Sequence, residues 1–163
     1  MIKVAKFYKI SKDNYFSVRG NCREEFEKIK LPERATVGSA GYDFYAPYDF
    51  ELYPGESAKI PTGIRVKIID GWALLIYPRS GLGFKYRLQL DNTVGIIDSD
   101  YFYSDNEGHI FIKITNDSRE EKVLSVKCGD AFAQGVFMPF GITEDDEVKD
   151  IRNGGFGSTT KVN

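Results

Sequence analysis

The apolar segments of this chain are short, and turn-forming residues separate them, which limits the folds available to it. Five of these segments have the composition of β-strands: IRVKII (64–69), ALLIY (73–77), HIFIKIT (109–115), KVLSVK (122–127) and AFAQGVFMPF (131–140). Turn signals such as Pro54-Gly55 and Asp70-Gly71 lie between them. Many short strands joined by turns indicate a closed or sandwiched all-β domain rather than βαβ units.

Helical spacing is found in one stretch, CREEFEKIK (22–30), where Cys22, Phe26 and Ile29 could share one face. We therefore expect a short helix at most. Residues 11–30 look like a polar excursion between the first strand and the rest of the chain. A length of 163 residues suits one domain, which we place at 1–140. Residues 141–163 are first acidic and then rich in glycine, and we expect them to form a C-terminal arm.

Composition excludes several kinds of site and partner. His109 is the single histidine, so there is no HExxH zinc site, and a Ser-His-Asp triad would have to use it. Cys22 and Cys128 fit neither a CxxC motif nor a zinc knuckle. A net charge of −2 does not favour a nucleic-acid partner. The N-terminus lacks the apolar core of a signal peptide, and no run approaches the roughly 18 apolar residues of a membrane span. We expect a cytoplasmic protein with no membrane partner.

Five polar segments do not look like ordinary turns: SAGYD (39–43), PRSG (78–81), DNTVGIIDSDY (91–101), GDAFAQ (129–134) and RNGGFGSTT (152–160). Arg79 and Ser80, with freed backbone N–H groups, suit a phosphate or a carboxylate. Gln134 stands in an apolar strand, so its amide is either hydrogen-bonded internally or faces a ligand. Asp98 and Asp100 are both candidate general bases, and their spacing does not choose between them.

Taken in order, these segments resemble the motifs of the all-β, homotrimeric dUTPase family. The resemblance runs from about Leu31 to Thr160 and is carried by LPERATVGSAGYDFYAP (31–47), PRSGLGFKY (78–86), DNTVGIIDSDY (91–101), GDAFAQGVFMP (129–139) and GGFGSTT (154–160). It implies a distorted, jelly-roll-like β-barrel whose glycine-rich arm closes over an active site. The implied reaction is Mg²⁺-dependent hydrolysis of dUTP to dUMP and pyrophosphate, in a homotrimer whose subunits share each site.

The resemblance also implies residue roles. Asp98 would activate the water that attacks the α-phosphorus, in preference to Asp100, and Asp43 would support the site. The uracil pocket would use Asn92, the backbone of Gly95, Ile96 and Ile97, and the strand near Phe111, with Tyr101 beneath the deoxyribose and Phe156 over the base. The residues expected on the phosphates or in the closing arm are Arg79, Ser80, Gly81, Gln134, Arg152, Gly157, Ser158 and Thr159. No residue would bind Mg²⁺ directly, because the phosphates and waters would hold it.

Two departures from the family pattern are visible. Residues 102–107 (FYSDNE) intervene before Gly108, and we interpret them as a surface extension that leaves the pocket unchanged. Arg152 lies one residue closer to Gly154 than is common. Two alternatives are a dCTP deaminase of the same fold and a non-enzymatic regulatory module. A protein partner of such a module could bind at 11–30 or 102–107, which could equally be solvated loops.

Overall fold

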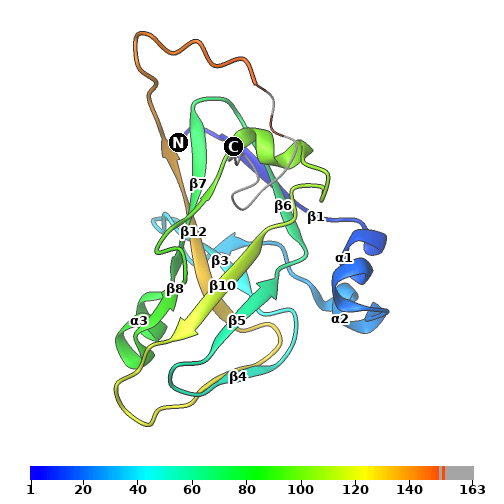
Figure 1. The fold of residues 1–163 in the computed structure, drawn as a ribbon, viewed down its shortest axis with the longest axis vertical. Helices are drawn as coiled ribbons and strands as arrows, with labels where there is room; N and C mark the ends of the chain where they lie inside the picture. The colour runs from blue at the N-terminus through cyan, green and yellow to red at the C-terminus, as the bar shows by residue number, and fades with distance from the viewer. Residues whose placement is uncertain (151, 153–163) are drawn as a thin grey trace, which may run out of the picture.

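The structure, a computed structural model, describes residues 1–150 and residue 152. Strands dominate these residues, and the helices are short (Figure 1). The strands are β1 (Ala5–Lys9), β2 (Glu33–Arg34), β3 (Tyr42–Tyr45), β4 (Phe50–Leu52), β5 (Ser57–Pro61), β6 (Ile64–Ile68), β7 (Trp72–Pro78), β8 (Leu88–Leu90), β9 (Gly95–Ile97), β10 (Phe111–Asn116), β11 (Leu124–Val126) and β12 (Ala131–Pro139). The helices are α1 (Lys12–Arg19), α2 (Arg23–Lys28), α3 (Ser80–Tyr86) and the 3₁₀ helix η1 (Ser99–Tyr103).

All strand pairs among the described residues are antiparallel, and they form four sheets. The largest has the order β2-β3-β12-β7-β9, and a second has the order β5-β10-β8. The two-stranded sheets are β1-β6 and β11-β4. Every predicted strand is present, although the segment 109–115 begins its strand at Phe111 and the segment 122–127 is reduced to β11. The predicted all-β class is confirmed.

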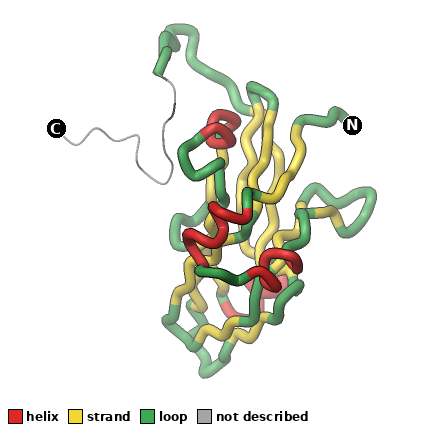
Figure 2. The backbone as a smooth tube through the Cα atoms, turned by 90° about the vertical axis from the view of Figure 1, so that its right-hand side faces the viewer, coloured by secondary structure: helices red, strands yellow, loops and turns green. Residues whose placement is uncertain are grey.

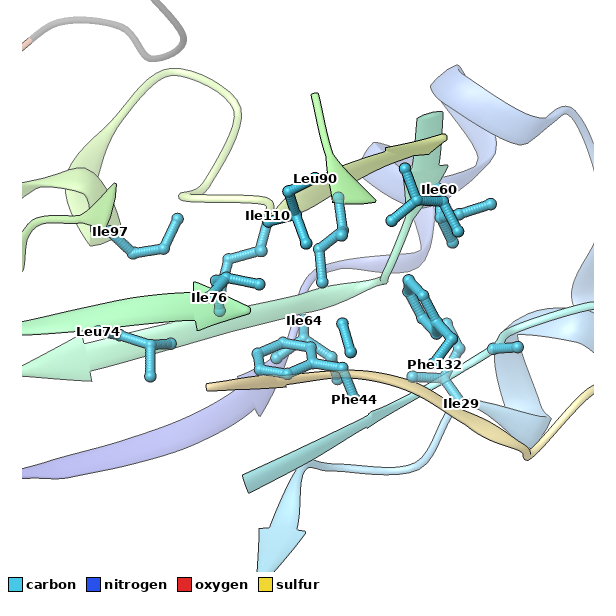
Figure 3. Close-up of a cluster of buried hydrophobic side chains, with 14 of the residues drawn as sticks. Ile29, Phe44, Ile60, Ile64, Leu74, Ile76, Leu90, Ile97, Ile110 and Phe132 are labelled. Carbon is cyan, nitrogen blue, oxygen red and sulfur yellow. The ribbon is translucent and has the colours of Figure 1, made fainter. Parts of the chain in front are cut away.

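The alternation predicted for the 109–115 segment determines which side chains enter the core. Ile110, Ile112 and Ile114 are 0%, 2% and 0% exposed. Figure 3 shows Ile110 in one cluster with Phe44 of β3 and Phe132 of β12, so the two larger sheets share a core. Full burial of side chains of this size contributes about 1.5–3 kcal/mol each. The core therefore fixes the relative position of the strands that carry the polar segments.

The short helix predicted within 22–30 is present as α2, but the expectation of a single short helix is wrong, because the described residues also contain α1, α3 and the 3₁₀ helix η1. Residues 11–30 contain α1 and α2, which pack against one flank of the strands (Figures 1 and 2). Tyr15 and Phe26 are buried, with ring centroids 5.6 Å apart. Because α1 has few apolar residues, its sequence gives a weak helical pattern, and its packing depends on the buried Tyr15.

Glu25 joins the two helices of this hairpin. Its carboxylate accepts hydrogen bonds from Arg19 at 2.9 Å and from the Tyr15 hydroxyl at 2.5 Å. Burial alone would raise the pKa of Glu25, but the hydrogen bonds from Arg19 and Tyr15 lower it below its usual value. The excursion at 11–30 is therefore a folded helical hairpin rather than a solvated loop.

The chain after β12 leaves the body of the molecule. Residues 141–150 are all exposed, and Figure 1 shows them extending beyond the end of β12. Arg152 is half-buried and returns to the body of the molecule. Across residues 1–150, no helix is both long and apolar enough to cross a membrane.

Candidate active site

A pocket of about 610 Å³ lies between the β9 hairpin, the start of β10 and the beginning of η1. Its wall includes the backbone of β9, which follows a tight turn at Asn92 to Val94. In that turn, Thr93 has a φ of 67°, and the Val94 N–H donates to the Asn92 carbonyl at 2.7 Å. The pocket residues are Lys59, Ile76, Leu90, Asp91, Asn92, Val94, Gly95, Ile96, Ile97, Tyr101, Phe111, Ile112, Lys113 and Arg152.

Close packing explains why glycine occupies position 95. A Cβ atom at Gly95 would lie 3.1 Å from the Cβ of Ile76 on the neighbouring strand β7. The register pairs these two residues directly. Glycine therefore lets the β9 backbone approach β7, and the opposite edge of β9 is the edge of the five-stranded sheet in the described part of the chain. That edge presents backbone polar groups to a ligand in the pocket.

Asp98 directly follows Ile97, the last residue of β9 and part of the pocket lining, and is half-buried. Burial raises its pKa, the Arg152 guanidinium opposes that rise, and the carboxylate of Asp100 adds to it. Arg152 donates to both carboxylates, by Nη2 to Asp98 and by Nε to Asp100 at 3.0 Å. Asp98 is therefore a desolvated carboxylate with a guanidinium beside it.

Tyr101 lines the pocket with its ring and is 4% exposed. Its hydroxyl donates to the His109 carbonyl at 2.6 Å and accepts from the Asn106 amide at 2.9 Å. Burial is the main reason that the pKa of Tyr101 is raised. The hydroxyl is thus held from two sides by the chain that follows it.

A second, smaller hollow of about 280 Å³ holds the other predicted polar residues. It is lined by Arg79, Ser80, Gly81, Leu82, Ala131 and Gln134. The Gln134 amide donates to the Pro78 carbonyl at 3.1 Å, and Arg79 Nε lies 3.2 Å from an Asp43 oxygen. In Figure 1, α3, which follows Arg79, lies at the lower left, whereas η1 lies near the top of the molecule. The two hollows of one chain are therefore well separated.

The structure thus divides the predicted residues into two groups. Those brought together in the larger pocket are Asn92, Gly95, Ile96, Ile97, Tyr101, Phe111 and Arg152, with Asp98 beside them. Arg79, Ser80, Gly81 and Gln134 line the smaller hollow, with Asp43 against Arg79. Phe156, Gly157, Ser158 and Thr159 lie outside the described residues. The roles of all these residues stay predictions.

Comparison with known proteins decides the family. A family model described as dUTPase matches residues 27–160. The chain belongs to the dUTPase family. It is 45% identical over 134 residues to the deoxyuridine 5'-triphosphate nucleotidohydrolase of Lactococcus lactis, covering 80% of this chain and 88% of that protein. Identity to the Histophilus somni (strain 2336) protein of the same name is 43% over 142 residues, or 82% and 89% of the two chains.

The crystal structure of the dUTPase from Streptococcus mutans has the same fold. It superposes with a TM-score of 0.65 at 32% identity, and the match covers 85% of this chain and 98% of that one. The family match begins at residue 27, so helix α1 lies outside it.

Sequence reasoning missed three charged residues of the larger pocket, Lys59, Asp91 and Lys113. Lys113 lies 2.6 Å from Asp91, and its hydrogen bond is the main cause that lowers the pKa of Asp91. Two signals were available: Asp91 precedes Asn92, and Lys113 shares a strand face with Phe111. Lys59 pairs with Lys113 across β5 and β10, which only the strand register reveals.

Proposed function

We propose that this chain hydrolyses dUTP to dUMP and pyrophosphate. The observation that carries the proposal is the pocket lined by β9, with the half-buried Asp98 directly after that strand. Membership of the dUTPase family and the names of the bacterial relatives support it. In this proposal the β9 hairpin binds the base, and Asp98, directly after β9, activates the attacking water.

Uracil recognition follows from the position of β9 at a sheet edge. The outward backbone N–H and C=O groups of Gly95 to Ile97 can match the alternating acceptors and donor of the uracil edge, as an edge strand matches an added strand. Asn92 supplies an amide with both donors and an acceptor. The ring of Tyr101 forms a flat, buried surface for the deoxyribose. The tight hairpin leaves little room for a 5-methyl group on the base.

Asp98 would act as the general base. An ionised carboxylate accepts a proton from the attacking water, the water oxygen bonds to the α-phosphorus, and the bond to the α,β-bridging oxygen breaks. Burial raises the pKa of Asp98 and so strengthens it as a base. The Arg152 fork that now contacts Asp98 also suits phosphate oxygens, so a bound triphosphate would compete for it.

A homotrimer would bring the two hollows together. Arg79, Ser80 and Gln134 have the donors that a triphosphate requires, yet helix α3, which follows Arg79, lies far from η1, which follows Asp98 (Figure 1). If the smaller hollow of one subunit faces the larger pocket of the next, one dUTP molecule contacts both. The exposed segment 141–150 supports a further contribution from the arm of a neighbouring subunit.

Mg²⁺ fits this arrangement as an ion carried by the substrate. Among the described residues, no group of three His, Cys, Asp or Glu side chains could hold a metal ion. The donors in the smaller hollow are cationic or amide groups suited to phosphate rather than to a metal. We expect phosphate oxygens and waters to be its main ligands, with Arg79 and Gln134 orienting the same phosphates. When bound, Mg²⁺ neutralises charge that develops on the leaving pyrophosphate.

The test is pyrophosphate release from dUTP with Mg²⁺, beside dCTP, dTTP and UTP. Asp98→Asn should lower kcat on the order of 10²–10⁴-fold, because it removes the base while keeping the shape. Asp100→Asn is the matched control, since Asp100 contacts the same Arg152, and it should retain most activity. Equal losses in both variants would contradict the role of Asp98. Ammonia release from dCTP would support a deaminase instead.

A further inference from the structure

Residues 102–107 fold back onto Tyr101 instead of projecting into solvent. Ser104 is 5% exposed, and both its N–H and its hydroxyl donate to the Tyr101 carbonyl, at 3.1 Å and 2.7 Å. The Glu107 N–H then donates to the Ser104 carbonyl at 2.8 Å. None of residues 102–107 lines the larger pocket, so the extension contacts Tyr101 on the side away from the pocket.

The backbone of this extension requires an unusual conformation. Glu107 and Gly108 both have positive φ, 60° and 72°. A Cβ atom at Gly108 would lie 2.7 Å from the Tyr101 carbonyl oxygen, so only glycine fits there. Positive φ at Glu107 costs about 1 kcal/mol and persists only where surrounding contacts enforce it. These contacts bring Asn106 to the Tyr101 hydroxyl.

Asn106 uses both ends of its side-chain amide. Its Nδ2 donates to the Tyr101 hydroxyl at 2.9 Å, and its Oδ1 accepts from the Gly108 N–H at 3.1 Å. Its carbonyl accepts from the His109 N–H at 3.1 Å. The donor nitrogen is therefore fixed in direction, and the Tyr101 hydroxyl is directed to the His109 carbonyl on its other side.

Glu107 fastens the extension to the helical hairpin. Its carboxylate accepts from the N–H and the hydroxyl of Ser11, at 2.8 Å and 2.5 Å. Ser11 is the N-cap of α1 and also accepts from the Asn14 N–H. Arg65 donates to the Phe102 carbonyl at 2.6 Å and stacks on its ring, with Cζ 3.7 Å from the centroid. Ser11 at the start of α1 and Arg65 of β6 thus hold the segment next to Tyr101.

We propose that Asn106 is a positioning residue that sets the discrimination between deoxyribose and ribose by holding Tyr101 rigid. The inference rests on the proposed function, in which the Tyr101 ring lies beneath the sugar. An apolar surface that can shift rejects an added hydroxyl only about 10²-fold. The Tyr101 ring is held at its hydroxyl by two hydrogen bonds and can shift less, so a ribose 2'-hydroxyl would clash with it.

The experiment measures Kd for the α,β-imido analogues of dUTP and UTP, with Mg²⁺, and therefore does not depend on turnover. Asn106→Asp keeps the acceptor for the Gly108 N–H but removes the donor to Tyr101. The preference for the deoxy analogue should fall roughly fivefold, the effect of one lost hydrogen bond. Asp105→Asn, at an exposed neighbour, is the matched control and should leave the preference unchanged.

Tyr101→Phe separates positioning from general stability. Without the hydroxyl there is nothing for Asn106 to hold, so Asn106→Asp should have no further effect on the preference in that background. An unchanged preference in Asn106→Asp, even with a lower Tm, would overturn the inference. So would an equal change in Asp105→Asn, or a wild type that binds both analogues equally. Failure of the wild type to release pyrophosphate from dUTP, with analogue binding intact, would instead contradict the proposed function.

Discussion

The two hollows of this chain differ in how firmly their side chains are held by neighbouring groups. The larger pocket is bounded by a hairpin and by a buried tyrosine whose hydroxyl is held by two hydrogen bonds. In the smaller hollow, Arg79 remains 44% exposed beside a single carboxylate, Asp43. The proposed base pocket lies within one chain, where the edge strand β9 offers both shape and hydrogen-bonding groups. A flexible triphosphate requires charges that close around it, and in the proposed trimer these would come together only on assembly.

The largest expected effect is in mixed trimers, which test whether the two hollows of one site come from different subunits. Asp98→Asn damages the larger pocket and Arg79→Glu the smaller hollow, and each variant alone should lose at least about 100-fold in activity. If each site takes Asp98 from one subunit and Arg79 from another, co-expression should restore about one quarter of the sites. Pyrophosphate release by purified mixed trimers measures this.

The control for mixed trimers is co-expression of Asp98→Asn with Asp98→Ala, which damage the same hollow and should restore nothing. Mixed trimers of Asp98→Asn and Arg79→Glu that stay inactive would mean that each chain builds its site alone. A species that light scattering finds monomeric at every concentration would contradict the shared site altogether.

Acid should lower the free energy of unfolding through His109, which lies beside the larger pocket's Phe111. His109 is fully buried, its ring centroid lies 4.2 Å from that of Phe111, and burial lowers its pKa to about 4. The unfolded chain binds a proton near the ordinary value of 6.5, so stability is fully present above that pH and is lost as pH falls toward about 4. The loss attributable to His109 is about 3 kcal/mol.

Urea unfolding at fixed protein concentration, from pH 7 to pH 4, measures the loss. The control is His109→Gln, whose amide can still accept the hydrogen bond that the Gly63 N–H gives to Nε2 at 3.0 Å. Because His109 is the single histidine, the difference between the two pH profiles isolates it. Parallel profiles would show that burial of His109 contributes nothing to acid sensitivity.

The sequence predicted the parts that depend on local pattern or on family motifs. Alternation placed Ile110, Ile112 and Ile114 in the core, and the motif order identified the family. It could not reveal helix α1, because the burial of Tyr15 against the strands, rather than an apolar stripe, holds that helix in place. Nor could it reveal the contact of Asn106 with Tyr101, which depends on a positive-φ turn at Glu107.

The same reasoning explains the lysine that was missed. Lys59 reaches the pocket through the register of β5 with β10, a pairing between segments more than 40 residues apart. No local period carries that information, because strand pairing is set by the shared core. The family motifs supplied Phe111 and Arg152 although both lie outside the hairpin, whereas Lys59, which belongs to none of those motifs, could be found only from the strand register.

The smallest expected effect concerns the smaller hollow. Asp43→Asn keeps the shape of the side chain but removes the charge 3.2 Å from Arg79 Nε. We expect KM for dUTP to rise roughly fivefold, since the guanidinium loses the partner that orients it, with kcat changed less. Stability should change by no more than about 1 kcal/mol, because Arg79 is well exposed to solvent.

Asp49→Asn is the matched control, because Asp49 pairs with Lys127 at 3.0 Å and lines neither hollow. A large loss of stability without a change in KM would mean that Asp43 holds the strand rather than the arginine. The smaller hollow would then be as firmly built as the pocket.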